Sequence, residues 1–100
     1  MALKQLQKVF TWLLENQVSN GTDLVGQVHD GEFCVKCWGS FDGCQVQIQI
    51  LAEDEITWIP LWNFSTVGCQ FGRVGNENER LRAVLDGAGA STNVSCTLTQ

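Results

Sequence analysis

The chain has 100 residues, of which 44% are hydrophobic and 17% are charged, and its net charge is −5 with only six Lys and Arg residues. This length fits one domain with a single modest core. The shortage of basic side chains argues against nucleic-acid binding and against anionic membrane surfaces, because both depend on basic groups that meet phosphates.

The first segment, residues 1–16, is predicted to be a short helix or arm in front of one β domain of residues 17–100. Its apolar side chains follow spacings of three and four residues, which is typical of one helical stripe. The stripe consists of Leu3, Leu6, Phe10 and Leu13. A strand over residues 10–14 is the alternative. Lys and Gln interrupt the apolar residues, so the segment predicts neither a secretory signal nor a membrane span.

Apolar and amide side chains alternate after a turn at Asp42 and Gly43. The apolar positions are Val46, Ile48 and Ile50, and the amide positions are Gln45, Gln47 and Gln49. Period-two alternation after a Gly-containing turn indicates antiparallel strands with one buried and one wet face. Amides form hydrogen bonds but do no acid–base work at neutral pH. The wet face is therefore interpreted as a contact surface.

Further strands are predicted wherever short apolar runs lie between turn residues. The predicted strands are residues 24–28, 32–38, 44–51, 56–61, 64–74, 80–85 and 93–98. Pro60 is expected at an edge or at a strand end, because proline lacks the N–H that a central strand needs. Six to seven short strands at this spacing indicate a mainly β fold. The predicted fold is an antiparallel β-sandwich, either Ig-like or jelly-roll-like.

The five cysteines are an odd number, so they predict free thiols in a reducing compartment rather than a complete disulfide framework. Cys34 and Cys37 form a C-x-x-C pair, which is half of a zinc site or a redox dithiol in other settings. The remaining zinc ligands would come from Cys44, Cys69, Cys96 or His29. Residues three apart on a strand point to opposite faces. The pair is therefore interpreted as packing, and no metal or cofactor is expected.

No catalytic site is predicted, and the chain is not expected to be an enzyme. His29 lies beside Asp30 at a turn, without a nucleophile motif near it in the sequence. The acidic run of residues 53–55 lacks the spaced ligands of a calcium loop. It is interpreted as a solvated hairpin tip.

The four tryptophans allow two uses. Trp38 and Trp58 lie within strand patterns and are expected to supply core packing. Trp12 and Trp62 fall outside the buried patterns, and they are predicted to contact a protein partner or to pack locally. The other interpretation is a carbohydrate-binding module that uses Trp12, Trp38 or Trp62 as a platform.

Two segments resemble small virion proteins of tailed bacteriophages. The first is the run from Gly39 to Gln49, GSFDGCQVQIQ, followed by Asp54 and by Trp58-Ile59-Pro60. It is similar to the pattern G-[ST]-[FW]-x-G-A-x-V-x-[LI]-[QE] followed by D-G-x-x-W. The second is LRAVL at residues 81–85, followed by GAGAST at residues 87–92, which resembles the closing hairpin of those proteins. Cys44 stands where alanine is usual.

The resemblance implies a non-enzymatic structural protein, most simply a decoration or cement protein that stabilises the capsid. The expected partners are the major capsid protein and copies of the chain itself, in a homo-oligomer within the virion, after synthesis in the host cytoplasm. A tail, neck or fibre adaptor is the structural alternative. The residues predicted to form the protein interface are Leu3, Leu6, Phe10, Trp12, Gln45, Gln47, Gln49, Trp62 and Phe64.

Overall fold

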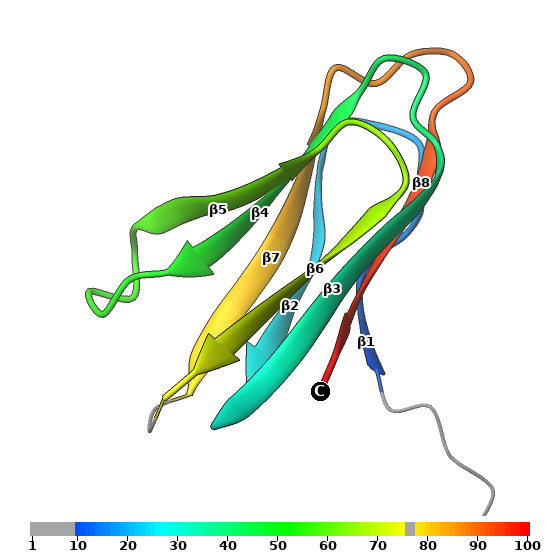
Figure 1. Cartoon of the computed structure of the whole chain (residues 1–100). Coiled ribbons are helices and arrows are strands. Elements are labelled where there is room, and N and C mark those ends of the chain that lie inside the picture. Colours follow the sequence, from blue (N-terminus) through cyan, green and yellow to red (C-terminus); the bar gives the residue numbers. More distant parts are fainter. Residues whose placement is uncertain (1–9, 76–77) are drawn as a thin grey trace, which may run out of the picture.

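A computed structural model describes residues 10–75 and 78–100 of the chain, and it consists of strands joined by turns and loops (Figure 1). The strands are β1 (Phe10–Gln17), β2 (Gly21–Val28), β3 (Gly31–Ser40), β4 (Gln45–Leu51), β5 (Trp58–Phe64), β6 (Gly68–Val74), β7 (Glu79–Asp86) and β8 (Asn93–Thr99). The predicted all-β class is confirmed, with eight strands instead of six or seven.

The strands form two four-stranded antiparallel sheets (Figure 1). Sheet A has the order β1-β8-β3-β6, and sheet B has the order β2-β7-β4-β5. The first strand pairs with the eighth, the second with the seventh, the third with the sixth and the fourth with the fifth. This nested pairing is that of a long hairpin rolled into two sheets, which is the strand arrangement of a jelly roll.

The helix predicted for the N-terminal segment is wrong over its described part. Phe10–Gln17 is the strand β1, which pairs with β8 and crosses the boundary suggested at residue 16. The register shifts after Trp12 and again after Leu14, and both Leu13 and Leu14 are fully buried. A helix would leave this edge of β8 without hydrogen-bond partners, whereas a strand satisfies them. The predicted interface residues Leu3 and Leu6 lie outside the described residues.

The core lies between the two sheets and contains the apolar side chains that alternate along the strands. Val46 and Ile48 are fully buried, as predicted, and Ile50 packs against the core from its margin. The other large, fully buried side chains are Leu13, Leu14, Val28, Val35, Leu81, Leu85 and Val94. In residues 10–75 and 78–100 no helix is long and apolar enough to span a membrane.

The turn that connects β3 to β4 is held by its own backbone and by the loop after β7. Asp42 and Gly43 both have positive φ angles, of 46° and 82°, and the N–H of Cys44 donates to the carbonyl of Phe41 at 2.8 Å. These are the features of a tight β-turn with left-handed central residues, which here carries the chain from sheet A to sheet B. The Asp42 carboxylate also accepts a 2.8 Å hydrogen bond from the N–H of Ser91. The turn predicted at Asp42 and Gly43 is therefore confirmed, and it joins two of the loops that run from one sheet to the other, β3–β4 and β7–β8.

The sandwich is closed on one side and open on the other. β1 and β2 contact each other across the two sheets, whereas β5 and β6 are the outer strands at the opposite side. Pro60 lies in β5 at a shift in register, where its missing N–H breaks no central ladder. Its prediction as an edge residue is confirmed.

Candidate functional site

Aromatic side chains gather on the outer face of sheet A. We call the set of side chains that lines the depression there the aromatic groove: Phe10, Trp12, Lys36, Trp38, Thr97 and Thr99. They come from β1, β3 and β8, and the register sets Lys36 opposite Thr97, and Thr97 opposite Trp12. Since alternate side chains of a strand share one face, Val35 and Cys37 point into the core while Lys36 and Trp38 point outward.

The rings in the groove lie at an angle to one another. The Phe10 and Trp12 ring centroids are 5.2 Å apart at an interplanar angle of 84°, and the Trp12 and Trp38 centroids are 5.9 Å apart at 48°. Phe10 is 38% exposed and Trp38 is 40% exposed. The core position predicted for Trp38 is therefore wrong, because the strand turns this residue outward. Trp12 is on the surface as predicted, partly buried between the other two rings.

Polar groups accompany these rings. The two hydroxyl-bearing side chains are Thr97, which is only 5% exposed, and Thr99. The ion pairs of the described residues join Glu32 to Arg73 and Glu55 to Arg80, so Lys36 takes part in neither. The groove has a volume of about 130 Å³. It therefore combines apolar ring surface, hydroxyls and one positive charge in a small space.

Four of the five cysteines lie on strands of sheet A and divide between its two faces, and Cys44 lies in the β3–β4 turn. Cys37 lies in the core directly opposite Cys96, and the hydrogen bond between these thiols, together with burial, raises the pKa of Cys96. Cys34 is on the other face, where burial first and the neighbouring Cys69 second raise its pKa. Strand geometry thus separates Cys34 from Cys37, as the spacing predicts. All five thiols are free, and no described group of His, Cys, Asp and Glu side chains is arranged to hold a metal ion.

The amide row of Gln45, Gln47 and Gln49 lies on the outer face of sheet B, as predicted. The side chains of Gln47 and Gln49 are hydrogen-bonded to each other and to neighbouring strands. The Arg82 Nε donates to Gln49 at 2.7 Å, and the Gln49 amide donates to Gln47 at 2.7 Å. The chain continues from Gln47 to Asn63 at 3.5 Å. The Arg82 guanidinium also lies 4.4 Å from the centroid of the Trp58 ring, which is a cation–π distance.

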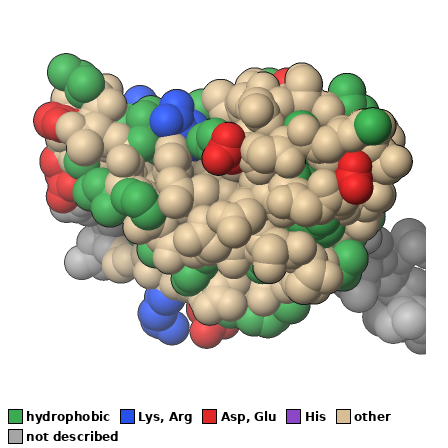
Figure 2. Space-filling view, turned by 90° about the horizontal axis from the view of Figure 1, so that it is seen from above, with side chains coloured by type: hydrophobic (Ala, Val, Ile, Leu, Met, Phe, Trp, Pro, Cys, Tyr) green, Lys and Arg blue, Asp and Glu red, His purple; other side chains and the backbone are tan. Residues whose placement is uncertain are grey.

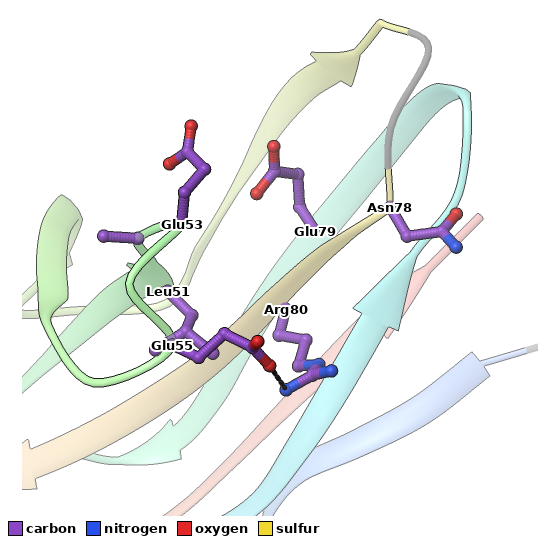
Figure 3. A pocket seen from close by; sticks show the side chains of 7 residues that line it. Leu51, Glu53, Glu55, Asn78, Glu79 and Arg80 are labelled. Carbon is purple, nitrogen blue, oxygen red and sulfur yellow. Dashed lines mark ion pairs between the residues drawn. The ribbon is translucent and has the colours of Figure 1, made fainter.

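An acidic pocket of about 320 Å³ lies beside the loop between β4 and β5 (Figure 3). Its ionisable side chains are Glu53, Glu55, Glu79 and Arg80, and Glu55 pairs with Arg80 at 3.6 Å. In Figure 3 Glu53 and Glu79 do not converge on Glu55. Asp54 is used in the loop itself, because its carboxylate accepts hydrogen bonds from the Thr57 hydroxyl and from the N–H groups of Thr57 and Ile56. These bonds lower the pKa of Asp54.

An apolar groove of about 330 Å³ lies at the open side of the sandwich, between β5 and β6. Trp62 lines it and packs against Phe33, with ring centroids 5.9 Å apart. Gly72 leaves room for both rings, since a Cβ there would lie 2.5 Å from Phe33 and 3.0 Å from Trp62. Of the two predicted interface residues in β5, Trp62 is thus mainly a packing residue at the margin of the core. Phe64 is buried inside the core and is not part of the surface.

Exposed apolar side chains lie on the two strands that flank this groove, and we call them together with it the open edge. They are Ile59 and Leu61 on β5 and Phe71 on β6, of which Phe71 is 71% exposed. Ile56 adds an exposed apolar side chain at the tip of the β4–β5 loop, which projects from the body in Figure 1. Figure 2 shows hydrophobic and acidic side chains together at this end of the molecule.

His29 is part of the structure of the turn between β2 and β3. Its Nδ1 lies 2.9 Å from the Asn78 side-chain oxygen, and its backbone N–H and carbonyl both bond to the side chain of Gln100. A histidine held in this way fastens the C-terminus to the turn. No nucleophile is among these partners.

The structure brings two predicted interface residues, Phe10 and Trp12, into one site. It adds three residues that the sequence analysis did not connect with Phe10 and Trp12. They are Lys36, Thr97 and Thr99. The alternation of β3 was the available signal for Lys36. Thr97 and Thr99 join the site only through the pairing of β8 with β1 and β3. Comparisons with protein-family models, with curated proteins and with solved structures each found no significant match.

Proposed function

We propose that this chain is a non-enzymatic structural protein of a bacteriophage virion that decorates the capsid and attaches to its subunits and to copies of itself. The open edge is the observation that carries the proposal. Two unpaired edge strands, β5 and β6, flank an apolar groove there. Edge strands offer free backbone groups for pairing, and soluble monomers rarely leave such an apolar edge uncovered.

The composition of the open edge suits attachment to another protein better than catalysis. Its groove is lined mainly by apolar side chains, with Arg73 and Glu79 as its ionisable members. A partner strand that pairs with β5 or β6 gains main-chain hydrogen bonds, and it covers Leu61 in the first case or Phe71 in the second. Repeated attachment to several subunits then stabilises a shell through multivalency.

The assignment to a virion comes from two further features. The nested pairing of eight strands is an architecture shared by viral capsid and lectin domains. The residues that resemble phage virion proteins include the β3–β4 turn, where Asp42 accepts a hydrogen bond from Ser91 in the loop between β7 and β8. This hydrogen bond joins the two segments that resemble phage virion proteins.

Electron microscopy of virus particles with and without the gene for this chain tests the proposal. We expect particles without it to lack surface knobs and to lose their capsid at a lower temperature. Complementation with a variant that carries Leu61→Asp and Phe71→Asp should not restore the knobs. Val18→Asp is the matched control, because Val18 is an exposed apolar residue in the β1–β2 loop, away from the open edge. Unchanged capsids with altered tails would contradict the decoration role and favour the tail adaptor.

Carbohydrate binding is the second candidate function, and one observation favours it. Trp12 and Trp38, two of the three tryptophans proposed for a platform, lie 5.9 Å apart in the aromatic groove. Aromatic rings that face solvent beside hydroxyls are a suitable surface for the apolar faces of sugar rings. Trp62 belongs to the open edge and is not part of this platform.

A further inference from the structure

We infer that the aromatic groove binds a single sugar ring that carries a carboxylate, such as a uronic acid residue within a glycan. The inference rests on the second candidate function and is independent of attachment through the open edge. The groove is formed by β1, β3 and β8, whereas the open edge is formed by β5 and β6. Loss of one site should therefore leave the other intact.

The three rings of the groove lie at different angles to one another. Phe10 stands nearly perpendicular to Trp12, and Trp38 is tilted by 48° to it on the opposite side. Three rings at these angles present faces and edges toward one small space instead of one flat wall. The C–H groups of a pyranose ring pack against such faces, and aromatic side chains lose little conformational entropy when they do so.

The groove also contains hydroxyl groups. Thr97 and Thr99 line the same groove as the rings, and Thr97 is held rigidly because it is 95% buried between β1 and β3. A hydroxyl both donates and accepts a hydrogen bond, so it matches the hydroxyl groups of a sugar. A few placed polar groups among apolar ones are the usual composition of a small-molecule site.

The charge of the groove selects among sugars. The chain has a net charge of −5, yet the ionisable side chain in the groove is the ammonium of Lys36. The other charges on this face that lie on β3 and β6, Glu32 and Arg73, are paired with each other at 3.9 Å. Lys36 is therefore left to attract an anion, and a carboxylate on the sugar ring supplies one.

Size and position decide against a protein partner at this site. A volume of about 130 Å³ is well below the ~300–1,000 Å³ of pockets that hold drug-sized ligands, so the groove fits one ring. Of the three strands of the groove, β8 and β3 are interior strands of sheet A, and β1 is its outer strand, which lies against β2 of sheet B. Phe10 and Trp38 in the groove are nevertheless more than a third exposed, so a longer glycan can continue across the sheet.

Titration calorimetry with two oligosaccharides of equal length, one of glucuronate residues and one of glucose residues, tests the inference. We expect the acidic one to bind about tenfold more tightly at low salt, with the difference reduced at high salt. Trp38→Ala should weaken the binding of both by about tenfold or more. Lys36→Gln should abolish the preference for the acidic one and leave the weaker binding of the neutral one. Val18→Ala is the control, because Val18 is an exposed apolar residue in the β1–β2 loop and does not line the groove, and it should leave the binding of both oligosaccharides unchanged.

Several results would overturn the inference. They are the absence of binding to either oligosaccharide, equal binding of the two, or binding that survives Trp38→Ala. Circular dichroism establishes that each variant is folded, and Trp12→Phe gives a second, milder change in the same groove. The variant with Leu61→Asp and Phe71→Asp should still bind the acidic oligosaccharide. Binding lost in that variant as well would contradict the separation of the two sites. A virion phenotype without any sugar binding would leave the proposed decoration role standing and remove this inference alone.

Discussion

The outer faces of the two sheets differ in how far their side chains satisfy one another. On sheet B, Arg82, Gln49 and Gln47 form a continuous chain of hydrogen bonds, and Arg82 also covers Trp58. On sheet A, the rings of Phe10 and Trp38 remain more than a third exposed beside Lys36, which has no ion-pair partner in the described chain. A face whose groups already bond to one another has less to gain from a ligand.

This difference changes the interpretation of the alternating glutamines. The amide row was predicted to be a contact surface because amides bind without reacting. In the structure, Gln47 and Gln49 are hydrogen-bonded to each other along β4. Gln49 also accepts a hydrogen bond from β7, and Gln47 donates one to β5. The unsatisfied surface lies instead on sheet A and at the open edge. Four experiments compare how the two outer faces, the core and the β4–β5 loop contribute to stability.

The largest effect is expected at Gly39 of β3, which lies close to the backbone of β8. Gly39, next to Trp38, has a φ of +120°, and a Cβ there would lie 2.2 Å from the Asn93 carbonyl oxygen. Gly39→Ala should reduce the free energy of unfolding by about 4 kcal/mol, because it combines a clash with backbone and a strained φ. Gly21→Ala in sheet B is the control, since its φ is +132° but nothing lies within 4 Å. It should cost about 1–2 kcal/mol in urea unfolding. Equal losses would show that strain alone acts at Gly39.

Opposite sides of β4 should differ almost as strongly. Ile48→Ala removes a fully buried side chain from the core and should cost about 3 kcal/mol. Gln47→Ala, one residue earlier on the outer face, should cost at most about 1 kcal/mol, because it removes only hydrogen bonds near the surface. Chemical denaturation of both variants measures the difference. A larger loss for Gln47→Ala would mean that the outer face, and not the core, stabilises sheet B.

A direct comparison of the two faces comes from their cations. Arg82→Ala should cost about 1 kcal/mol, because it removes the hydrogen bond to Gln49 and the contact with Trp58. Lys36→Ala on sheet A should change stability by less than about 0.5 kcal/mol. Arg82→Lys keeps the charge without the Nε donor, so it should recover only part of the loss. A cost for Lys36→Ala as large as that for Arg82→Ala would contradict the contrast between the faces.

The smallest effect concerns the β4–β5 loop and its dependence on pH. Hydrogen bonds from Thr57 and Ile56 lower the pKa of Asp54 below its ordinary value of 3.8. A carboxyl with a lowered pKa in the folded state stabilises the loop fully above pH 3.8 and loses this contribution as the pH falls through the lowered value. We expect NMR titration of Thr57→Val to return the Asp54 pKa toward 3.8. An unchanged pKa in this variant would mean that the backbone N–H groups alone lower it.

Much of the fold follows from local pattern. The alternation over residues 44–51 predicts both the strand and its buried face, and the glycine after Asp42 predicts the turn, because each is a property of a few neighbouring residues. β1 could not be predicted in this way. Its Leu13 and Leu14 are both buried through shifts in register against β8, and such irregularities depend on a partner strand far away in the sequence. Leu13 and Leu14 lie three and four residues after Phe10, and this spacing is also typical of a helical stripe.

The sequence by itself determined the β class, the single core, the shortage of positive charge and the separation of Cys34 from Cys37, because these depend on composition and on the period of a strand. Only the tertiary structure decided what lies on each face. The aromatic groove joins residues 10–12, 36–38 and 97–99, which are neighbours solely through the pairing of β8 with β1 and β3. The open edge likewise exists because β5 and β6 end their sheets on the same side. Neither pairing is a property of any short stretch of the chain.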